Sequence, residues 1–212
     1  MGYFDVRLPF DARRAMVWRE IVSYLAPLLD GRTRVLEIGA GYCAFINAVQ
    51  APERTAMDIS DLITTHAADG VKTRVGDLRK EELSASSYDA VLASNLFEHF
   101  SDDEFETVIG RVHAALAPGG ILIAIQPNFR TSFRNYFDDY THKKIFTDEG
   151  LSEALVAHGF EIVRRDARFL PFSFKSSPGI LPLGLLKLAV RLYLRLPWRP
   201  GAGQMLIIAK KA

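Results

Sequence analysis

The stretch VLEIGAGYCAF, Val35 to Phe45, decides the fold of this chain. Its first four residues suit a buried strand, and Gly39-Ala40-Gly41 follows directly. Glycine after a strand lets the backbone turn tightly and approach a ligand, and G-x-G-x-x-A also satisfies the loose dinucleotide pattern. The stretch therefore predicts a strand, a turn and a ligand against that turn. It leaves open whether the ligand is a dinucleotide, a phosphate or another cofactor.

Short apolar runs alternate with helical patterns along most of the chain. Runs that suit strands occupy 33–38, 54–59, 72–77, 88–94, 120–126, 160–170 and 203–211. Helical patterns occupy 11–29, 43–50, 60–68, 102–116 and 147–158. This alternation predicts an α/β fold, a Rossmann-like, doubly wound, mostly parallel sheet with helices on both faces.

Length and composition suit one globular domain. We expect a single domain over 1–212 that begins with a helical segment over 1–30. The only cysteine, Cys43, excludes an intramolecular disulfide, and neither a signal peptide nor an apolar run of about 18 residues is visible. These features predict a cytoplasmic protein.

Polar residues at the ends of the expected strands indicate the kind of cofactor. Glu37 stands two residues before the first glycine, where an anion is unfavourable beside a pyrophosphate but suits an amine and a sulfonium. Asp58 ends the next strand and can accept two hydrogen bonds from a ribose diol. Asp77, followed by the apolar Leu78, can accept from an adenine amine, and Asn95 lies at the expected switch point of the sheet.

In these ordered motifs the sequence resembles the class I S-adenosylmethionine-dependent methyltransferases, and most of all the small-molecule branch that includes the quinone-biosynthesis enzymes. The resemblance runs from about Thr33 to Val163 and implies a seven-stranded sheet whose antiparallel last strand is GQMLIIAKK. It also implies that S-adenosylmethionine is the cofactor. The residues that it assigns to cofactor binding are Glu37, Gly39, Ala40, Gly41, Asp58, Ile59, Asp77, Leu78 and Asn95. The chain departs from the family at Cys43, where a third glycine is usual.

The same resemblance places the methyl acceptor beside FDDYTHKKIFTDEG, residues 137–150. A hydroxyl acceptor usually needs a general base, and histidine is matched to neutral pH. His142 is the first candidate for this catalytic role and His99 the second, with Tyr140 and Thr141 as substrate contacts. The alternative is that these residues only brace the loop. No metal-ligand cluster of convincing spacing is visible in the sequence.

The C-terminal part of the chain differs in charge. Residues 1–166 carry a net charge of −7 and residues 167–212 a net charge of +8. A basic amphipathic helical insertion is expected over 178–200, with Lys187, Arg191 and Arg195 four residues apart and Trp198 beyond them. The apolar face of this helix is wider than packing on the domain alone requires. The helix is therefore expected to contact a homodimer mate, to cover the acceptor as a lid, or to contact the inner membrane surface. Nucleic acid is not expected, because the rest of the chain is acidic.

The leading prediction is therefore methyl transfer from S-adenosylmethionine to an O or N nucleophile of a small-molecule or lipid-linked acceptor. Two alternatives come from other functional classes. One is a nicotinamide-dependent oxidoreductase. The other is a non-catalytic binding module that keeps the S-adenosylmethionine fold, and Cys43 in place of the third glycine is the feature that favours it.

Overall fold

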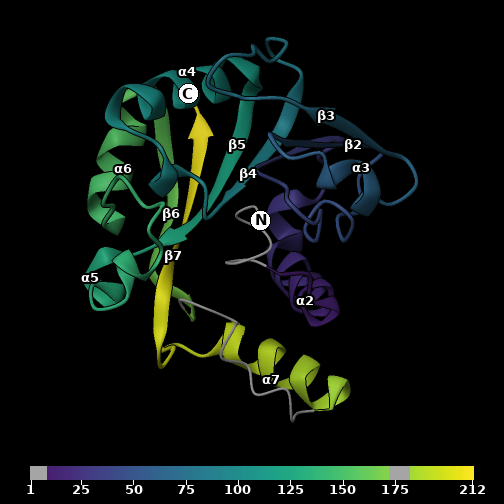
Figure 1. The fold of residues 1–212 in the computed structure, drawn as a ribbon, viewed down its shortest axis with the longest axis vertical. Coiled ribbons are helices and arrows are strands. Elements are labelled where there is room, and N and C mark those ends of the chain that lie inside the picture. The colour runs from purple at the N-terminus through teal and green to yellow at the C-terminus, as the bar shows by residue number, and fades with distance from the viewer. Residues whose placement is uncertain (1–8, 172–181) are drawn as a thin grey trace.

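The computed structural model describes residues 9–171 and 182–212 of the chain. The parts of the expected segments 1–30 and 178–200 that fall in 1–8 and 178–181 lie outside the described residues. Figure 1 shows one central twisted sheet with helices on either side of it.

Seven strands form that sheet, in the order β3-β2-β1-β4-β5-β7-β6. The strands are β1 (Arg34–Ile38), β2 (Glu53–Asp58), β3 (Val71–Val75), β4 (Tyr88–Ser94), β5 (Leu116–Pro127), β6 (Phe160–Pro171) and β7 (Ala202–Lys211). Strand β7 runs antiparallel to both of its neighbours, and the pairs formed among β1 to β5 are parallel. The predicted seven-stranded sheet with an antiparallel last strand is confirmed.

The central strands bury side chains on both faces, which explains their nearly continuous apolar sequence. In β5, Ile121, Ile123 and Ile125 enter one core, whereas Leu122 and Ala124 enter the other. Because successive side chains of a strand point to opposite faces, one apolar run supplies two cores. Parallel strands that are covered by helices on both faces therefore need apolar residues at nearly every position.

Helices cover both faces, as predicted. Helices α4 (Asp102–Ala115) and α6 (Asp148–Ala157) contribute to one core, and α2 (Ala12–Leu29) and α7 (Leu183–Arg195) to the other. Ser101 caps α4 in a capping box with Glu104, and the Thr147 hydroxyl caps α6 by accepting from the Gly150 N–H. The short elements are α3 (Leu62–His66), η1 (Phe97–His99), α5 (Phe129–Ser132) and η2 (Tyr136–Asp138).

The helix expected over 43–50 is wrong, because this segment is a series of turns. Cys43 has a left-handed φ of 56°, which a right-handed helix excludes. The backbone N–H of Ile46 donates to Glu37 Oε2 at 3.0 Å instead of entering a regular helical ladder. Individual helical bonds remain, such as the one from the Asn47 N–H to the Cys43 carbonyl at 3.0 Å. The helix expected over 60–68 is also shorter, since α3 spans only Leu62–His66.

Helix α7 packs against α2 through its basic residues as well as its apolar ones. Arg191 Nε lies 2.9 Å from Glu20 Oε2, and Lys187 Nζ lies 3.8 Å from Glu20 Oε1. The Glu20 side chain is 5% exposed, so these pairs neutralise a buried carboxylate. The expected basic stripe exists, but two of its members bind within the domain.

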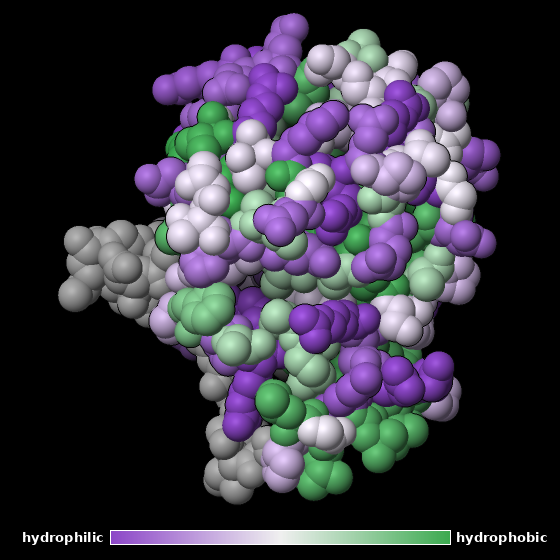
Figure 2. Space-filling view, turned by 90° about the vertical axis from the view of Figure 1, so that its right-hand side faces the viewer, coloured by the Kyte–Doolittle hydropathy of each residue, from purple (hydrophilic) through white to green (hydrophobic). Residues whose placement is uncertain are grey.

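The opposite side of α7 is apolar and open. Leu183, Leu185, Leu188 and Leu192 are each more than half exposed, as is Trp198 beyond the helix. In Figure 2 green side chains gather at the lower edge of the molecule, at the level that α7 occupies in Figure 1. Within the described part of the chain, no helix has the length and apolar character that a membrane span requires.

Candidate functional site

The candidate site lies where the parallel strands end. A cleft there is lined by residues at or just after the ends of β1, β2, β3 and β4: Ile38, Gly39, Met57, Asp58, Ile59, Gly76, Leu78, Leu96 and Phe100. The strand order reverses between β1 and β4, and such a switch point leaves a crevice at the carboxyl edge of the sheet. The predicted residues Gly39, Asp58, Ile59 and Leu78 therefore share one cleft.

The turn after β1 is built from left-handed residues. Gly39 and Gly41 have φ values of 66° and 48°. A Cβ on Gly39 would lie 2.9 Å from Leu96 Cδ1, so the turn and the segment after β4 are in direct contact. The backbone conformation favours glycine at both positions, and the turn brings main chain to the edge of the cleft.

Cys43 holds the third left-handed position of this turn, where the family that the sequence resembles usually has glycine. Its side chain is buried, with Sγ 3.9 Å from the Ile63 carbonyl oxygen. Burial raises the pKa of the Cys43 thiol to about 12, so the thiol stays protonated and is not a nucleophile. Cys43 is therefore a packing residue in a conformation that suits glycine.

Two carboxylates hold the turn in place. Asp58 Oδ2 accepts from the Gly41 N–H at 2.8 Å, and Asp58 Oδ1 accepts from the Ser60 N–H at 2.8 Å. Glu37 Oε2 accepts from the Ile46 N–H on the other side of the turn. Burial raises the pKa of Glu37 to about 8 and raises that of Asp58. A cationic ligand group close to Glu37 would favour its charged form.

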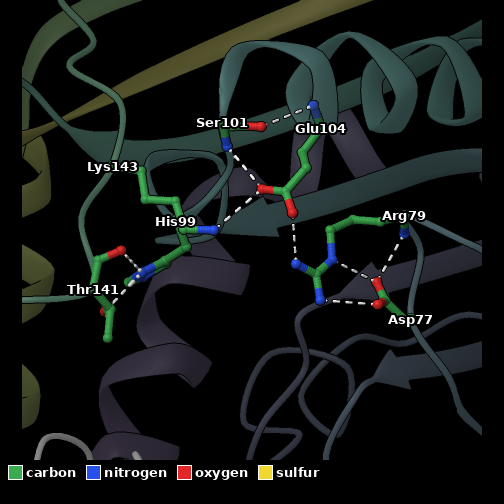
Figure 3. A network of polar contacts seen from close by, with 7 residues as sticks. All are labelled: Asp77, Arg79, His99, Ser101, Glu104, Thr141 and Lys143. Atoms are coloured by element: carbon green, nitrogen blue, oxygen red, sulfur yellow. Dashed lines mark hydrogen bonds and ion pairs between the residues drawn. The ribbon is translucent and has the colours of Figure 1, made fainter.

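Asp77 is part of a polar network that Figure 3 shows. Its carboxylate accepts from Arg79 Nε at 2.8 Å and from Arg79 Nη2 at 2.9 Å. Arg79 Nη1 donates to Glu104 at 2.7 Å, and Lys143 Nζ donates to the same carboxylate at 3.3 Å. The Arg79 guanidinium lowers the pKa of Asp77. The network therefore joins the end of β3 to the start of α4 and to the segment before α6.

Asn95 lies at the end of β4 with a left-handed φ of 48°. Its side-chain oxygen accepts from Gln204 Nε2 at 2.6 Å, and the Leu96 N–H donates to Gln126 Oε1 at 3.1 Å. These two glutamines fix the segment that follows β4, and our sequence analysis did not identify them. The available signal was a glutamine next to the apolar run of each of two strands.

The structure brings the two predicted catalytic histidines together. The imidazole ring centroids of His99 and His142 lie 5.1 Å apart, although the residues belong to separate segments. Thr141 Oγ1 lies 3.0 Å from His99 Nδ1, so this predicted residue contacts the pair. Tyr140, in contrast, is 77% exposed and points away from the protein interior.

Glu98 completes this group, and it is a residue that the sequence analysis did not assign. Glu98 Oε1 lies 3.9 Å from His142 Nε2 and 4.0 Å from His99 Nε2. Glu98 is fully buried, and burial raises its pKa to about 8. Burial and the neighbouring His142 lower the pKa of His99. We call Glu98, His99 and His142 the Glu98 cluster.

A second hollow, of about 410 Å³, lies at the opposite edge, where the strands begin. Its charged residues include Arg34, Glu53, Lys72 and Arg74. These bind oppositely charged side chains of the chain itself: Arg34 binds Asp89, Lys72 binds Glu53, and Arg74 binds Glu81. The polar groups here are already satisfied, so we assign the site to the carboxyl edge.

Comparisons with known proteins identify the family of the chain. Residues 10–165 match the family model described as a methyltransferase domain. No curated protein matches the sequence.

Solved structures with a similar fold include a SAM-dependent methyltransferase from Archaeoglobus fulgidus, at 19% identity and a TM-score of 0.70, covering 99% of this chain and 97% of that one. An S-adenosylmethionine-dependent methyltransferase from Mesorhizobium loti is 18% identical, with a TM-score of 0.64 and coverage of 91% and 97%. The 1,6-didemethyltoxoflavin-N1-methyltransferase of Burkholderia thailandensis, solved with its substrate and S-adenosylhomocysteine, is 20% identical, with a TM-score of 0.63 and coverage of 99% and 84%.

Proposed function

Because the chain belongs to the methyltransferase domain family, we propose that it transfers the methyl group of S-adenosylmethionine to an O or N nucleophile of a small-molecule or lipid-linked acceptor. One observation carries this proposal. Asp58, at the end of β2, binds the left-handed glycine turn and lines the cleft at the same time. A carboxylate in this position is suited to a ribose diol beside a turn that admits a close ligand.

The other cofactor residues have proposed roles that start from this position of the ribose. The methionine part lies against Gly39, Ala40 and Gly41, with its amine toward Glu37. The exposed side chain of Ile59 and the buried Leu78 provide apolar walls for the adenosine part. Asp77 receives the adenine amine on an oxygen that it shares with Arg79, and Asn95 closes the cleft beyond β4.

The acceptor lies on the side of the cleft where η1 and the segment before α6 meet. His99 and His142 are the candidates for the general base that removes the acceptor proton, and the Thr141 hydroxyl positions His99. Methyl transfer needs alignment of the nucleophile with the sulfonium and exclusion of water, because the sulfonium is already activated. The exposed Phe133, Phe137 and Tyr140 in the same region favour an acceptor with apolar surface.

The exposed leucines of α7 support an acceptor delivered from a lipid surface, as in the quinone-biosynthesis branch that the sequence resembles. Of the basic residues in this region, Lys187 and Arg191 bind Glu20, and Arg199 is 9% exposed. Lipid contact therefore depends on Leu185, Leu188 and Leu192 more than on charge. Co-sedimentation with anionic vesicles should be lost in a Leu188→Ser, Leu192→Ser variant and kept in Arg195→Gln.

Transfer of labelled methyl groups tests the proposed reaction. The protein is incubated with methyl-labelled S-adenosylmethionine and with separate pools of lipid extract and water-soluble metabolites. Label in an extracted product that disappears with Gly39→Val would support the proposal. Label in neither pool, from protein that binds the cofactor, would contradict it.

A further inference from the structure

Three potential metal ligands converge in the Glu98 cluster. One ligand atom from each of Glu98, His99 and His142 can be chosen so that all lie within 4.8 Å of one another. The residues come from η1 and from the segment before α6, 43 positions apart in sequence. Their meeting is a consequence of the fold, which is why spacing in the sequence gave no sign of a metal site.

The carboxylate of Glu98 is the observation that points to a ligand. Both of its oxygens are buried and accept no hydrogen bond from the described residues. Oε1 nevertheless faces the Nε2 atoms of both imidazoles at 3.9 and 4.0 Å, which is beyond hydrogen-bond distance. A buried carboxylate without a hydrogen bond is costly, and a cation between the three side chains would offset that cost.

The spacing of the ligand atoms suits a metal ion. In a tetrahedral site with bonds of about 2.0–2.1 Å, ligand atoms are separated by about 3.4 Å. The two distances from Glu98 Oε1, 3.9 and 4.0 Å, are wider than this, and all three ligand atoms lie within 4.8 Å of one another, so the side chains would have to close around the ion. Two imidazoles and one carboxylate form a ligand set that divalent zinc, cobalt, manganese and iron use while keeping positions open.

We propose that Glu98, His99 and His142 bind a divalent first-row transition-metal ion beside the methyl-transfer cleft. The side chains around the cluster are arranged to orient its ligands. Thr141 Oγ1 contacts His99 Nδ1 at 3.0 Å and Asp139 Oδ1 at 2.6 Å, which directs His99 Nε2 toward Glu98. A hydrogen bond to the far nitrogen of a ligating histidine is the usual second layer of a metal site.

The ion would give the acceptor side its chemistry, and this part of the inference rests on the proposed function. An acceptor hydroxyl bound to a divalent cation loses its proton to solvent more readily. The resulting oxygen forms a bond to the methyl carbon as the bond from that carbon to the sulfonium breaks, which leaves S-adenosylhomocysteine. In this arrangement His99 and His142 hold the ion, and the acceptor proton passes to solvent.

Metal titration tests the proposal without any acceptor. Protein dialysed against a chelator is titrated with Co²⁺, which reports its coordination by visible absorption, and with Zn²⁺ against a chromophoric chelator. We expect one ion per chain. We also expect His99→Ala, His142→Ala and Glu98→Gln each to weaken binding more than 100-fold, because loss of a second-layer residue alone costs about 10- to 100-fold.

His158→Ala is the matched control. His158 also faces a glutamate, with Nε2 2.6 Å from Glu106 Oε2, but that glutamate is exposed. This variant should bind the ion like the wild type. Zn²⁺ should raise the melting temperature of the wild type and not that of His99→Ala, which separates ion binding from misfolding of the buried variants.

Absence of stoichiometric binding in the wild type, or binding that the three cluster variants leave unchanged, would overturn the metal site. Calorimetry with S-adenosylhomocysteine on the same samples separates this result from the proposed function. Protein that transfers methyl groups but binds no ion contradicts only the metal site. Protein that binds the ion but transfers no methyl group contradicts only the proposed function.

Discussion

The glycine turn after β1 and the Glu98 cluster lie at the same edge of the sheet, but they are built differently. The turn is contiguous, and its shape depends on backbone angles at Gly39, Gly41 and Cys43. The cluster consists of side chains from two segments, with a buried carboxylate between two imidazoles. The comparison teaches that the proposed cofactor site depends on local conformation, whereas the proposed acceptor site depends on tertiary packing. Substitutions should therefore separate the two.

Gly39→Val should have the largest effect on cofactor affinity. Gly39 has a φ of 66°, and a Cβ would meet Leu96 at 2.9 Å, so a branched side chain distorts the turn and pushes on the segment after β4. We expect S-adenosylhomocysteine affinity to fall more than 100-fold, because a turn displaced by about 1 Å loses its aligned contacts. Calorimetry measures this.

Gly110→Ala is the control for Gly39→Val, since a Cβ on Gly110 meets no atom within 4 Å. It should keep full affinity and gain slightly in stability within α4. Wild-type affinity in Gly39→Val would mean that the turn does not contact the cofactor.

His99→Ala should impair transfer and leave cofactor binding unchanged. Removal of a group that acts on a proton typically lowers the rate about 10²- to 10⁴-fold. His99 does not line the cofactor cleft, so S-adenosylhomocysteine affinity should stay within about twofold of wild type. Single-turnover methyl transfer and calorimetry on the same protein check both statements. An equal loss of affinity would show that the two regions are not separable.

Asp58→Ala should weaken cofactor binding by roughly 10- to 100-fold. The substitution removes charge-assisted hydrogen bonds to the ribose, which contribute about 1.5–3 kcal/mol, and it also frees the Gly41 N–H. Asp58→Asn keeps one acceptor oxygen, so its cofactor affinity should lie between that of Asp58→Ala and that of the wild type. Asp69→Ala, on the exposed loop before β3, is the control. Unchanged affinity in Asp58→Ala would place the ribose elsewhere.

Cys43→Gly should have the smallest effect. Glycine relieves the left-handed φ of 56°, a gain of about 1 kcal/mol, while loss of the buried Sγ costs about the same. We expect the free energy of unfolding to change by less than about 1 kcal/mol, as measured in urea, and cofactor affinity to be kept. A large loss of affinity would show that the thiol itself shapes the site.

The sheet and the glycine turn could be predicted because their signals are local. Apolar strands followed by glycine or a carboxylate are visible in a few neighbouring residues, as at Val35–Gly41 and at Asp58. The helix expected over 43–50 failed because the Ile46 N–H binds Glu37, a contact that apolar spacing does not show.

Features that depend on distant residues could not be predicted in the same way. The role of Glu98 requires the path of the chain from β5 to His142. The binding of Arg191 to Glu20 joins residues 171 positions apart, so the sequence showed a basic stripe but not its partner. Our sequence analysis named His99 and His142 separately, and only the fold brings them together with Glu98.

Calorimetric titration of the wild-type protein with S-adenosylhomocysteine and, in parallel, with NAD tests the central claim most directly. The turn fixed by Asp58 and flanked by Glu37 suits an amine beside the glycines and disfavours a pyrophosphate. We predict one S-adenosylhomocysteine bound per chain and no heat from NAD. Binding of NAD without S-adenosylhomocysteine, or binding of neither, would contradict the account.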